Sequence, residues 1–179
     1  MLIPLLKLVF TLYAGLIVFL TIVLGIASAL TKVNLFKLFF ALKEPTILAF
    51  TTAASEAALP IAMEKLKKMG IPNHIVSFVL PLGYTFNLDG STLYSALAVV
   101  FIAQVYGVPF PIDQQILMMI TLMLSTKGIA GVPGGSLIVV AATSAAFGLP
   151  VEGLALILGI DRVLDMGRTV CNLLGNCIA

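Results

Sequence analysis

The 179-residue sequence contains no tryptophan, one histidine and two cysteines. Cys171 and Cys177 fall on one predicted helix, where they point about 240° apart at about 100° per residue. They cannot form a disulfide with each other there, and their spacing does not match a metal site. His74, between Asn73 and Ile75, is interpreted as a solvated loop residue. There is no basic patch with interleaved aromatic residues, and the net charge of +2 gives no reason to expect a nucleic-acid partner.

Charged residues are also scarce. They make up 10% of the chain, whereas hydrophobic residues make up 60%. Ordinary soluble domains carry about 25% charged residues. The mean hydropathy of +1.16 therefore predicts an integral membrane protein. The apolar run at residues 8–30 is too long for a signal peptide and can cross a bilayer.

The apolar segments predict an all-α membrane protein built from transmembrane helices, one of them broken, and two opposed re-entrant helical hairpins. Both ends look cut, so we expect a fragment of a longer chain. The predicted segments are a transmembrane helix at 1–31, a first hairpin at 36–70, a broken transmembrane helix at 74–107, a second hairpin at 112–148 and a truncated final transmembrane helix at 150–179.

The hairpins follow from segment length and from Gly and Pro positions. Apolar runs of about 10–14 residues are more often re-entrant than spanning. Residues 86–91 interrupt the central span, and the Gly- and Pro-rich stretch 127–135 interrupts the fourth segment. The unit of hairpin plus span occurs twice, with an odd number of crossings between the hairpins. Two such interrupted segments in corresponding halves indicate an inverted repeat and a transporter binding site.

The lysines predict the orientation. Most of them flank the first hairpin, whereas the loops at 104–115 and 148–153 carry only acidic charges. By the positive-inside rule, the first hairpin enters from the cytoplasm and the second from outside, in a multi-pass protein of the cell (inner) membrane. The flanking lysines are Lys32, Lys37, Lys43, Lys65, Lys67 and Lys68.

A polar stripe runs along the final helix. Placed at about 100° per residue, six polar side chains share one side and Arg162 falls at the edge. A charge at membrane depth costs roughly 2.5–3.5 kcal/mol on insertion scales, so charges persist there when they pair or serve a function. Purely structural pairing of Asp165 with Arg168, three residues apart, stays open as an alternative. The stripe consists of Asp161, Asp165, Arg168, Thr169, Asn172 and Asn176.

Three further ionisable residues are expected at membrane depth: Glu56, Asp89 and Lys127. They must pair with one another or face water or ligand. Non-helical backbone in a membrane survives only when it is buried in protein or lines a cavity. The break at Asn87–Gly90 is therefore a candidate cation site, although a kink with a satisfied Asp89 is the plainer alternative.

Four motifs stand in a fixed order: Ser55–Pro60, Asn87–Ser91, Gly128–Gly134, and Asp165–Thr169 followed by Asn172. With them the whole chain resembles the C-terminal part of the dicarboxylate/amino acid:cation symporters, the glutamate transporter family. It looks most like the bacterial proton-coupled glutamate/aspartate members. The resemblance implies a homotrimer for the full-length protein, and an acidic small molecule and the lipid bilayer as partners.

The resemblance also implies site roles. Arg168 would bind the side-chain carboxylate of the substrate, because a guanidinium matches a carboxylate, and Asp165 would bind its α-ammonium. The second hairpin would act as the extracellular gate. Arg162 would replace an arginine that some members carry where this chain has Ala53. The implied substrate-binding residues are Ser55, Ser91, Val132, Pro133, Gly134, Asp165, Arg168, Thr169 and Asn172, with Asp161 and Arg162 as adjacent charges.

The coupling ion is predicted from two departures from the sodium-coupled members. Asn176 stands where they have an aspartate, and Lys127 stands where their backbone serves a second sodium site. A hard cation binds less tightly with fewer anionic oxygens, so we favour a proton over sodium, with Glu56 or Asp89 as its carrier. No cofactor is expected, and sodium is the one metal considered. The implied coupling residues are Gly83, Thr85, Asn87, Asp89, Asn172, Asn176, Lys127 and Glu56.

The predicted function is secondary active symport of glutamate and aspartate by alternating access, not enzyme catalysis. The alternatives are a C4-dicarboxylate symporter, a sodium-coupled amino-acid carrier and, more distantly, an ion channel. Asp165 favours a substrate that carries an amine. An intramembrane aspartyl protease using Asp89 and Asp165 is disfavoured, because Arg168 lies beside Asp165 and the hairpins would serve no purpose.

Overall fold

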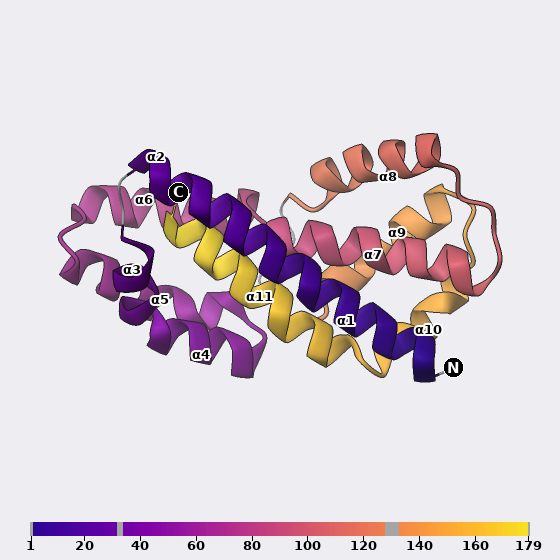
Figure 1. Ribbon diagram of the computed structural model, residues 1–179, viewed down its shortest axis with the longest axis horizontal. Coiled ribbons are helices and arrows are strands. Elements are labelled where there is room, and N and C mark those ends of the chain that lie inside the picture. The colour runs from indigo at the N-terminus through magenta and orange to yellow at the C-terminus, as the bar shows by residue number, and fades with distance from the viewer. Residues whose placement is uncertain (1, 32–33, 128–132, 179) are drawn as a thin grey trace.

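The computed structural model of the chain describes residues 2–31, 34–127 and 133–178 (Figure 1). Every regular element within these residues is helical, which confirms the predicted all-α class. The elements are α1 (Leu2–Phe19), the π-helix η1 (Leu20–Leu24), α2 (Gly25–Thr31), α3 (Leu35–Ala41), α4 (Lys43–Thr52), α5 (Ser55–Lys68), α6 (Asn73–Phe86), α7 (Asp89–Val105), α8 (Ile112–Ser125), α9 (Gly135–Ala146), the 3₁₀ helix η2 (Val151–Gly153), α10 (Leu154–Leu158) and α11 (Asp161–Ile178).

Within the described residues, two helical stretches are long and apolar enough to cross a membrane by length and composition. They are Leu2–Thr31, formed by α1, η1 and α2, and Asn73–Val105, formed by α6 and α7. The second stretch is interrupted where the sequence predicts a break: α6 ends at Phe86, and Asn87 and Leu88 leave helical geometry before α7 starts. Asp89 in the first turn of α7 suits the positive end of that helix.

The segment predicted as one final helix, 150–179, is divided. It forms η2, α10 and α11, with Gly159 and Ile160 between α10 and α11. α11 carries four charges in its first two turns, and it packs against α1, α4, α5, α6 and α7. Other helices therefore cover α11 on several sides. This arrangement is favourable, because burying charges together costs less than exposing them singly to hydrocarbon.

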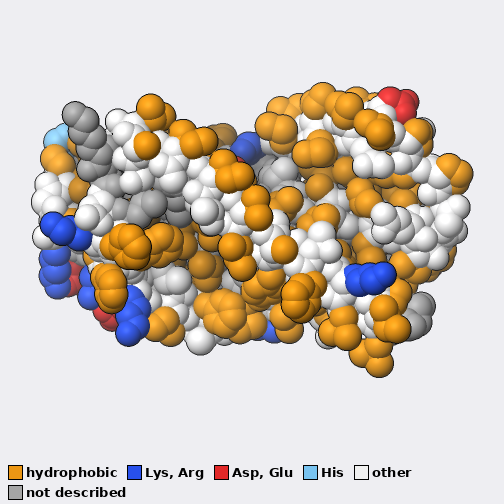
Figure 2. Space-filling view, viewed as in Figure 1, with side chains coloured by type: hydrophobic (Ala, Val, Ile, Leu, Met, Phe, Trp, Pro, Cys, Tyr) orange, Lys and Arg blue, Asp and Glu red, His pale blue; other side chains and the backbone are white. Residues whose placement is uncertain are grey.

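α4 and α5 form the first helical hairpin and pack against each other. The chain reverses at Ala53, which has a left-handed backbone with φ 53°, and extended Ala54. At the other end of this hairpin Lys65 pairs with Glu44 at 2.7 Å. The hydrogen bond to Glu44 raises the pKa of Lys65, and the bond from Lys68 lowers the pKa of Glu64. Figure 2 shows basic side chains gathered at the α3–α6 end of the molecule.

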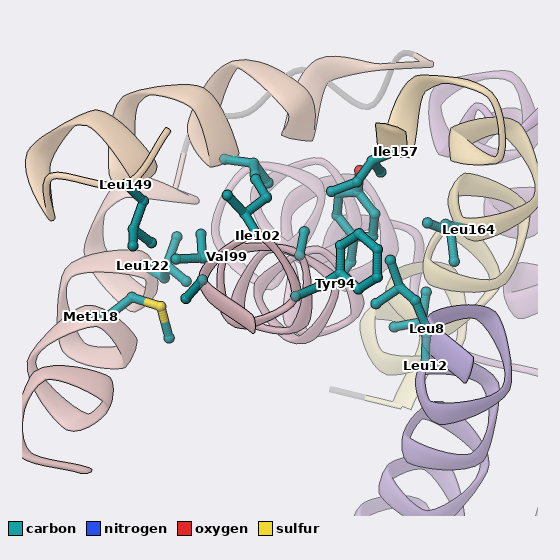
Figure 3. Packing of buried hydrophobic residues seen from close by; sticks show 14 of the residues in the cluster. Leu8, Leu12, Tyr94, Val99, Ile102, Met118, Leu122, Leu149, Ile157 and Leu164 are labelled. Atoms are coloured by element: carbon teal, nitrogen blue, oxygen red, sulfur yellow. The ribbon is translucent and has the colours of Figure 1, made fainter. Parts of the chain in front are cut away.

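The described residues form two apolar cores. One joins α1, α7, α8, α9 and α10 around Tyr94, Val99 and Ile102 (Figure 3). The other joins α3, α4, α5 and α6 with the C-terminal half of α11. In Figure 1, α1 and α11 lie side by side across the middle of the molecule, between the two ends. α11 therefore contributes to both cores.

Large apolar side chains also cover much of the surface (Figure 2). Phe10 is 80% exposed, Phe36 79% and Ile138 74%. Exposed apolar residues of this size, on several elements, are typical of a surface that meets lipid or another protein segment.

Gly90 lets α7 approach α11 closely, and this contact supplies a stability prediction. A Cβ at Gly90 would lie 2.5 Å from the Arg168 carbonyl oxygen and 2.9 Å from the Cys171 Cβ. Gly90→Ala should therefore push the helices apart and lower stability by about 1–3 kcal/mol, as overpacking does. The control is Gly25→Ala in α2, where a Cβ meets nothing within 4 Å. Thermal unfolding of the intact protein in detergent measures both variants. A Gly90→Ala melting temperature equal to that of Gly25→Ala would contradict the close contact between α7 and α11.

Candidate functional site

The polar stripe of α11 meets the start of α7 near the middle of the molecule. Most of the stripe is deeply buried: Asp165 is 1% exposed, Arg168 5% and Asn176 2%, whereas Asp161 at its start is half-buried. Asn172 and Thr169 are buried as well. These side chains come from one face of one helix, as the helical spacing predicts.

Arg168 holds the centre of the site. Its guanidinium forms an ion pair with Asp165 and donates to the Ser91 hydroxyl at 2.8 Å. It also lies over the Tyr94 ring, 5.6 Å from the centroid, where an aromatic face attracts a cation. Ser91 and Tyr94 both come from the first turns of α7. The guanidinium is thus surrounded by one anion, one hydroxyl and one aromatic ring.

Asp165 connects α11 to the start of α9. Its Oδ2 accepts a hydrogen bond from the backbone N–H of Gly134 at 2.9 Å. Gly134 precedes α9, so the backbone there reaches the carboxylate directly. Of the neighbouring predicted contacts, Pro133 is exposed and Val132 lies outside the described residues.

Asn172 joins α11 to the amino end of α7. Its Oδ1 accepts from the Gly90 N–H at 2.9 Å, and its Nδ2 donates to the Ser91 hydroxyl at 2.9 Å. The first N–H groups of a helix have no partner within that helix. Asn172 therefore satisfies the start of α7 while it fixes Ser91 beside Arg168.

Two outer charges of the stripe contact other elements. Asp161 Oδ1 accepts from the Tyr94 hydroxyl at 2.6 Å. Arg162 is exposed and donates to the Thr51 carbonyl at 2.9 Å, so it reaches the tip of the first hairpin next to Ala53. This places the guanidinium beside the first hairpin, and its role next to the substrate stays a prediction.

Ser55 and Thr169 are buried on α5 and α11. Within the described part of the chain, neither side chain hydrogen-bonds to Arg168 or Asp165. The structure therefore brings together Ser91, Gly134, Asp165, Arg168 and Asn172 as a connected group. Ser55 and Thr169 stay predictions for this group.

A second polar cluster lies at the break between α6 and α7. With its amide nitrogen turned toward the carboxylate, Asn87 donates to Asp89 Oδ2 at 2.8 Å. In this orientation the Asn87 amide oxygen lies 3.2 Å from Asn176 Oδ1. Gly83 lines the same place, since a Cβ there would lie 2.6 Å from Asn176 Oδ1. Lys127 reaches the break from the end of α8 and donates to the Phe86 carbonyl at 2.5 Å.

The remaining coupling candidates lie elsewhere. Thr85 is exposed and donates back to the Pro81 carbonyl at 3.4 Å within α6. Glu56 is exposed in the first turn of α5. The described residues contain no group of three or more His, Cys, Asp or Glu side chains placed to hold a metal. The oxygens at the break are nevertheless carboxylate, amide and carbonyl groups, the types that hard cations bind.

The sequence does not predict four contacts in and around the site. Tyr94 stacks on Arg168 and binds Asp161, and its position one helical turn after Ser91 was the available signal. The Thr92 hydroxyl lies 2.9 Å from that of Thr126, joining α7 to the end of α8. Gly90 provides the close approach of α7 to α11.

Comparison with known proteins gives a consistent result over the whole chain. Residues 1–179 match the model of the sodium:dicarboxylate symporter family. The chain is 54% identical over 178 residues to the proton/sodium-glutamate symport protein of Geobacillus stearothermophilus, covering 99% of this chain and 42% of that protein. It is 49% identical over 176 residues to the proton/glutamate-aspartate symporter of Escherichia coli K12, covering 98% of this chain and 40% of that protein.

A relative named for a different substrate is also similar. The chain is 45% identical over 174 residues to C4-dicarboxylate transport protein 2 of Polaromonas naphthalenivorans, covering 97% of this chain and 39% of that protein. The chain spans about two fifths of the length of these curated relatives.

Proposed function

The chain belongs to the sodium:dicarboxylate symporter family, and from this premise we propose that it forms the substrate-binding part of a secondary active symporter for glutamate and aspartate. The names of two relatives, a proton/sodium-glutamate symport protein and a proton/glutamate-aspartate symporter, support this substrate class. The family consists of transporters, so the buried charges are assigned to binding and not to catalysis.

The buried pair of Arg168 and Asp165 carries the proposal. The protein itself supplies a partner for each charge: Asp165 has Arg168 and the Gly134 N–H, and Arg168 has Asp165 and the Ser91 hydroxyl. An acidic amino acid offers both complementary groups. Its ammonium would replace the Gly134 N–H at Asp165, and its side-chain carboxylate would bind Arg168 and Ser91. Both buried charges would then stay paired. This matters because a buried charge without a partner costs several kcal/mol.

A C4-dicarboxylate is the second candidate substrate. The similarity to a C4-dicarboxylate transport protein favours it. A plain dicarboxylate can satisfy Arg168 but brings no donor to Asp165, which would have to keep its contacts with Arg168 and Gly134. We therefore rank the amino acid first.

For the coupling ion we propose a proton over sodium. Asn176 contributes a neutral amide and Lys127 a positive charge to the break, so Asp89 is the one carboxylate among the groups described there. One anionic oxygen donor favours a metal cation less than two would. Asp89 is the proposed proton carrier, and exposed Glu56 is the second candidate.

We further propose the membrane arrangement. The intact protein is a multi-pass homotrimer of the cell (inner) membrane, in which α4–α5 and α8–α9 form re-entrant hairpins that approach the site from opposite sides as an inverted repeat. The helix interruptions at 53–54 and 87–88 support this, since unwound backbone at membrane depth must lie in protein or line a cavity. The Gly134 contact with Asp165 supports the second hairpin as the gate that moves during alternating access.

The test is uptake by the intact protein in proteoliposomes, with proton and sodium gradients imposed separately. We expect saturable, stereoselective uptake of aspartate and glutamate, each competing with the other, driven by an inward proton gradient without sodium. Uptake of succinate but not aspartate would favour the dicarboxylate reading. Uptake that requires sodium and ignores pH would reject proton coupling, and a non-saturating flux would indicate a channel.

A further inference from the structure

The end of α6 carries an unusual cap. The last carbonyls of a helix have no partner within it, and they form the negative end of its dipole. α6 ends at Phe86, and the Phe86 carbonyl accepts from the Lys127 ammonium at 2.5 Å. The cap comes from the end of a distant helix, 41 residues along the chain.

The same helix end is rich in oxygen. Asn87, Asp89 and Asn176 place an amide, a carboxylate and a second amide beside it. Together with the Phe86 carbonyl and the helix dipole, these groups attract a positive charge. In the described residues, Lys127 is the cation that reaches the break.

The position of Lys127 is fixed by its neighbour. Thr126 is fully buried, its hydroxyl lies 2.9 Å from that of Thr92 in α7, and it donates to the Leu122 carbonyl at 2.7 Å. The end of α8 is therefore attached to the first turn of α7, which starts at the break. Lys127 is exposed, but buried Thr126 next to it fixes the backbone from which its ammonium reaches the Phe86 carbonyl.

We propose that Lys127 is a specificity-determining residue for the coupling cation, because its ammonium supplies a permanent positive charge where the break would otherwise bind a metal ion. This inference rests on the proposed symport function. With Lys127 present the site is already neutralised and transport has no need of sodium. Without it, the same carboxylate, amide and carbonyl oxygens are free to take a small hard cation.

The proposal is tested with Lys127→Met in the intact protein, by aspartate uptake in proteoliposomes at increasing sodium, with choline as the replacement ion. The wild type should respond little to sodium. The variant should lose uptake by roughly tenfold without sodium, about 1.4 kcal/mol, and recover most of it as sodium is added. Lys127→Arg, which keeps the charge, should behave like the wild type.

Two controls make the outcome decisive. Lys68→Met removes an exposed lysine far along α5 that pairs with Glu64 at the surface, and should leave the sodium response unchanged. Thermal unfolding of Lys127→Met and Lys127→Gln in detergent gives a reading independent of transport: sodium, but not choline, should stabilise both variants and not the wild type. A variant that transports like the wild type, or gains no stabilisation by sodium, overturns the inference. A wild type that needs sodium overturns it too, whereas a wild type without amino-acid uptake rejects the proposed function itself.

Discussion

Replacing Arg168 with methionine in the intact protein is expected to reduce aspartate uptake by a hundredfold or more. Arg168 is 5% exposed, and its guanidinium contacts Asp165, Ser91 and the Tyr94 ring. Removing one partner of a buried ion pair costs roughly 3–5 kcal/mol, because the other charge stays buried without compensation. The substrate carboxylate would lose its cation, and Asp165 would lose its partner. Initial uptake rates in proteoliposomes measure the loss.

The conservative variant separates charge from geometry. Arg168→Lys keeps the charge but loses the planar fork that binds two oxygens at once, so we expect a partial loss, smaller than that of the methionine variant. Lys68→Met is the control for removing a cation, since Lys68 is exposed on α5. Wild-type uptake by Arg168→Met, at equal protein in the membrane, would exclude Arg168 from substrate binding.

Helical periodicity was sufficient to predict the α11 face. Asp165, Arg168 and Asn172 lie on one side by spacing alone, and the structure buries them together. Asp165 and Arg168, three residues apart, form the ion pair that their spacing predicts. Periodicity cannot say which distant segment meets that face. The family motifs point to Ser91, 77 residues from Arg168. Spacing by itself does not single out Tyr94, because aromatic residues on apolar helices usually signal packing alone.

The helix interruptions, too, could be predicted only in part from the sequence. Asn87–Gly90 was recognisable because an amide, a carboxylate and a glycine interrupt an apolar run, and α6 does end at Phe86. The division of the final segment before α11 was missed, because Gly159 stands alone in an apolar stretch and isolated glycines are often tolerated in helices. Contacts such as Lys127 to Phe86 depend on how α8 sits against α7, which is a property of tertiary packing.

Asp165→Asn is expected to weaken binding of aspartate far more than binding of succinate. The carboxylate is 1% exposed and faces both Arg168 and the Gly134 N–H. An asparagine keeps the size and can still accept from Gly134, but it offers the substrate ammonium no charge. The lost charge-assisted contact in a buried site corresponds to roughly 3–5 kcal/mol, or a hundredfold or more in affinity. A dicarboxylate makes no such contact.

The ratio of the two affinities is the informative quantity, because the variant also leaves Arg168 without its anion, and this affects both ligands. An unpaired Arg168 attracts any carboxylate, so succinate binding should hold or strengthen while aspartate binding falls. Isothermal titration with the intact protein in detergent gives both values. Asp113→Asn, which removes an exposed aspartate from the first turn of α8, is the matched control and should change neither. Equal losses for the two ligands would remove the amine-binding role from Asp165 and favour a dicarboxylate as the natural substrate.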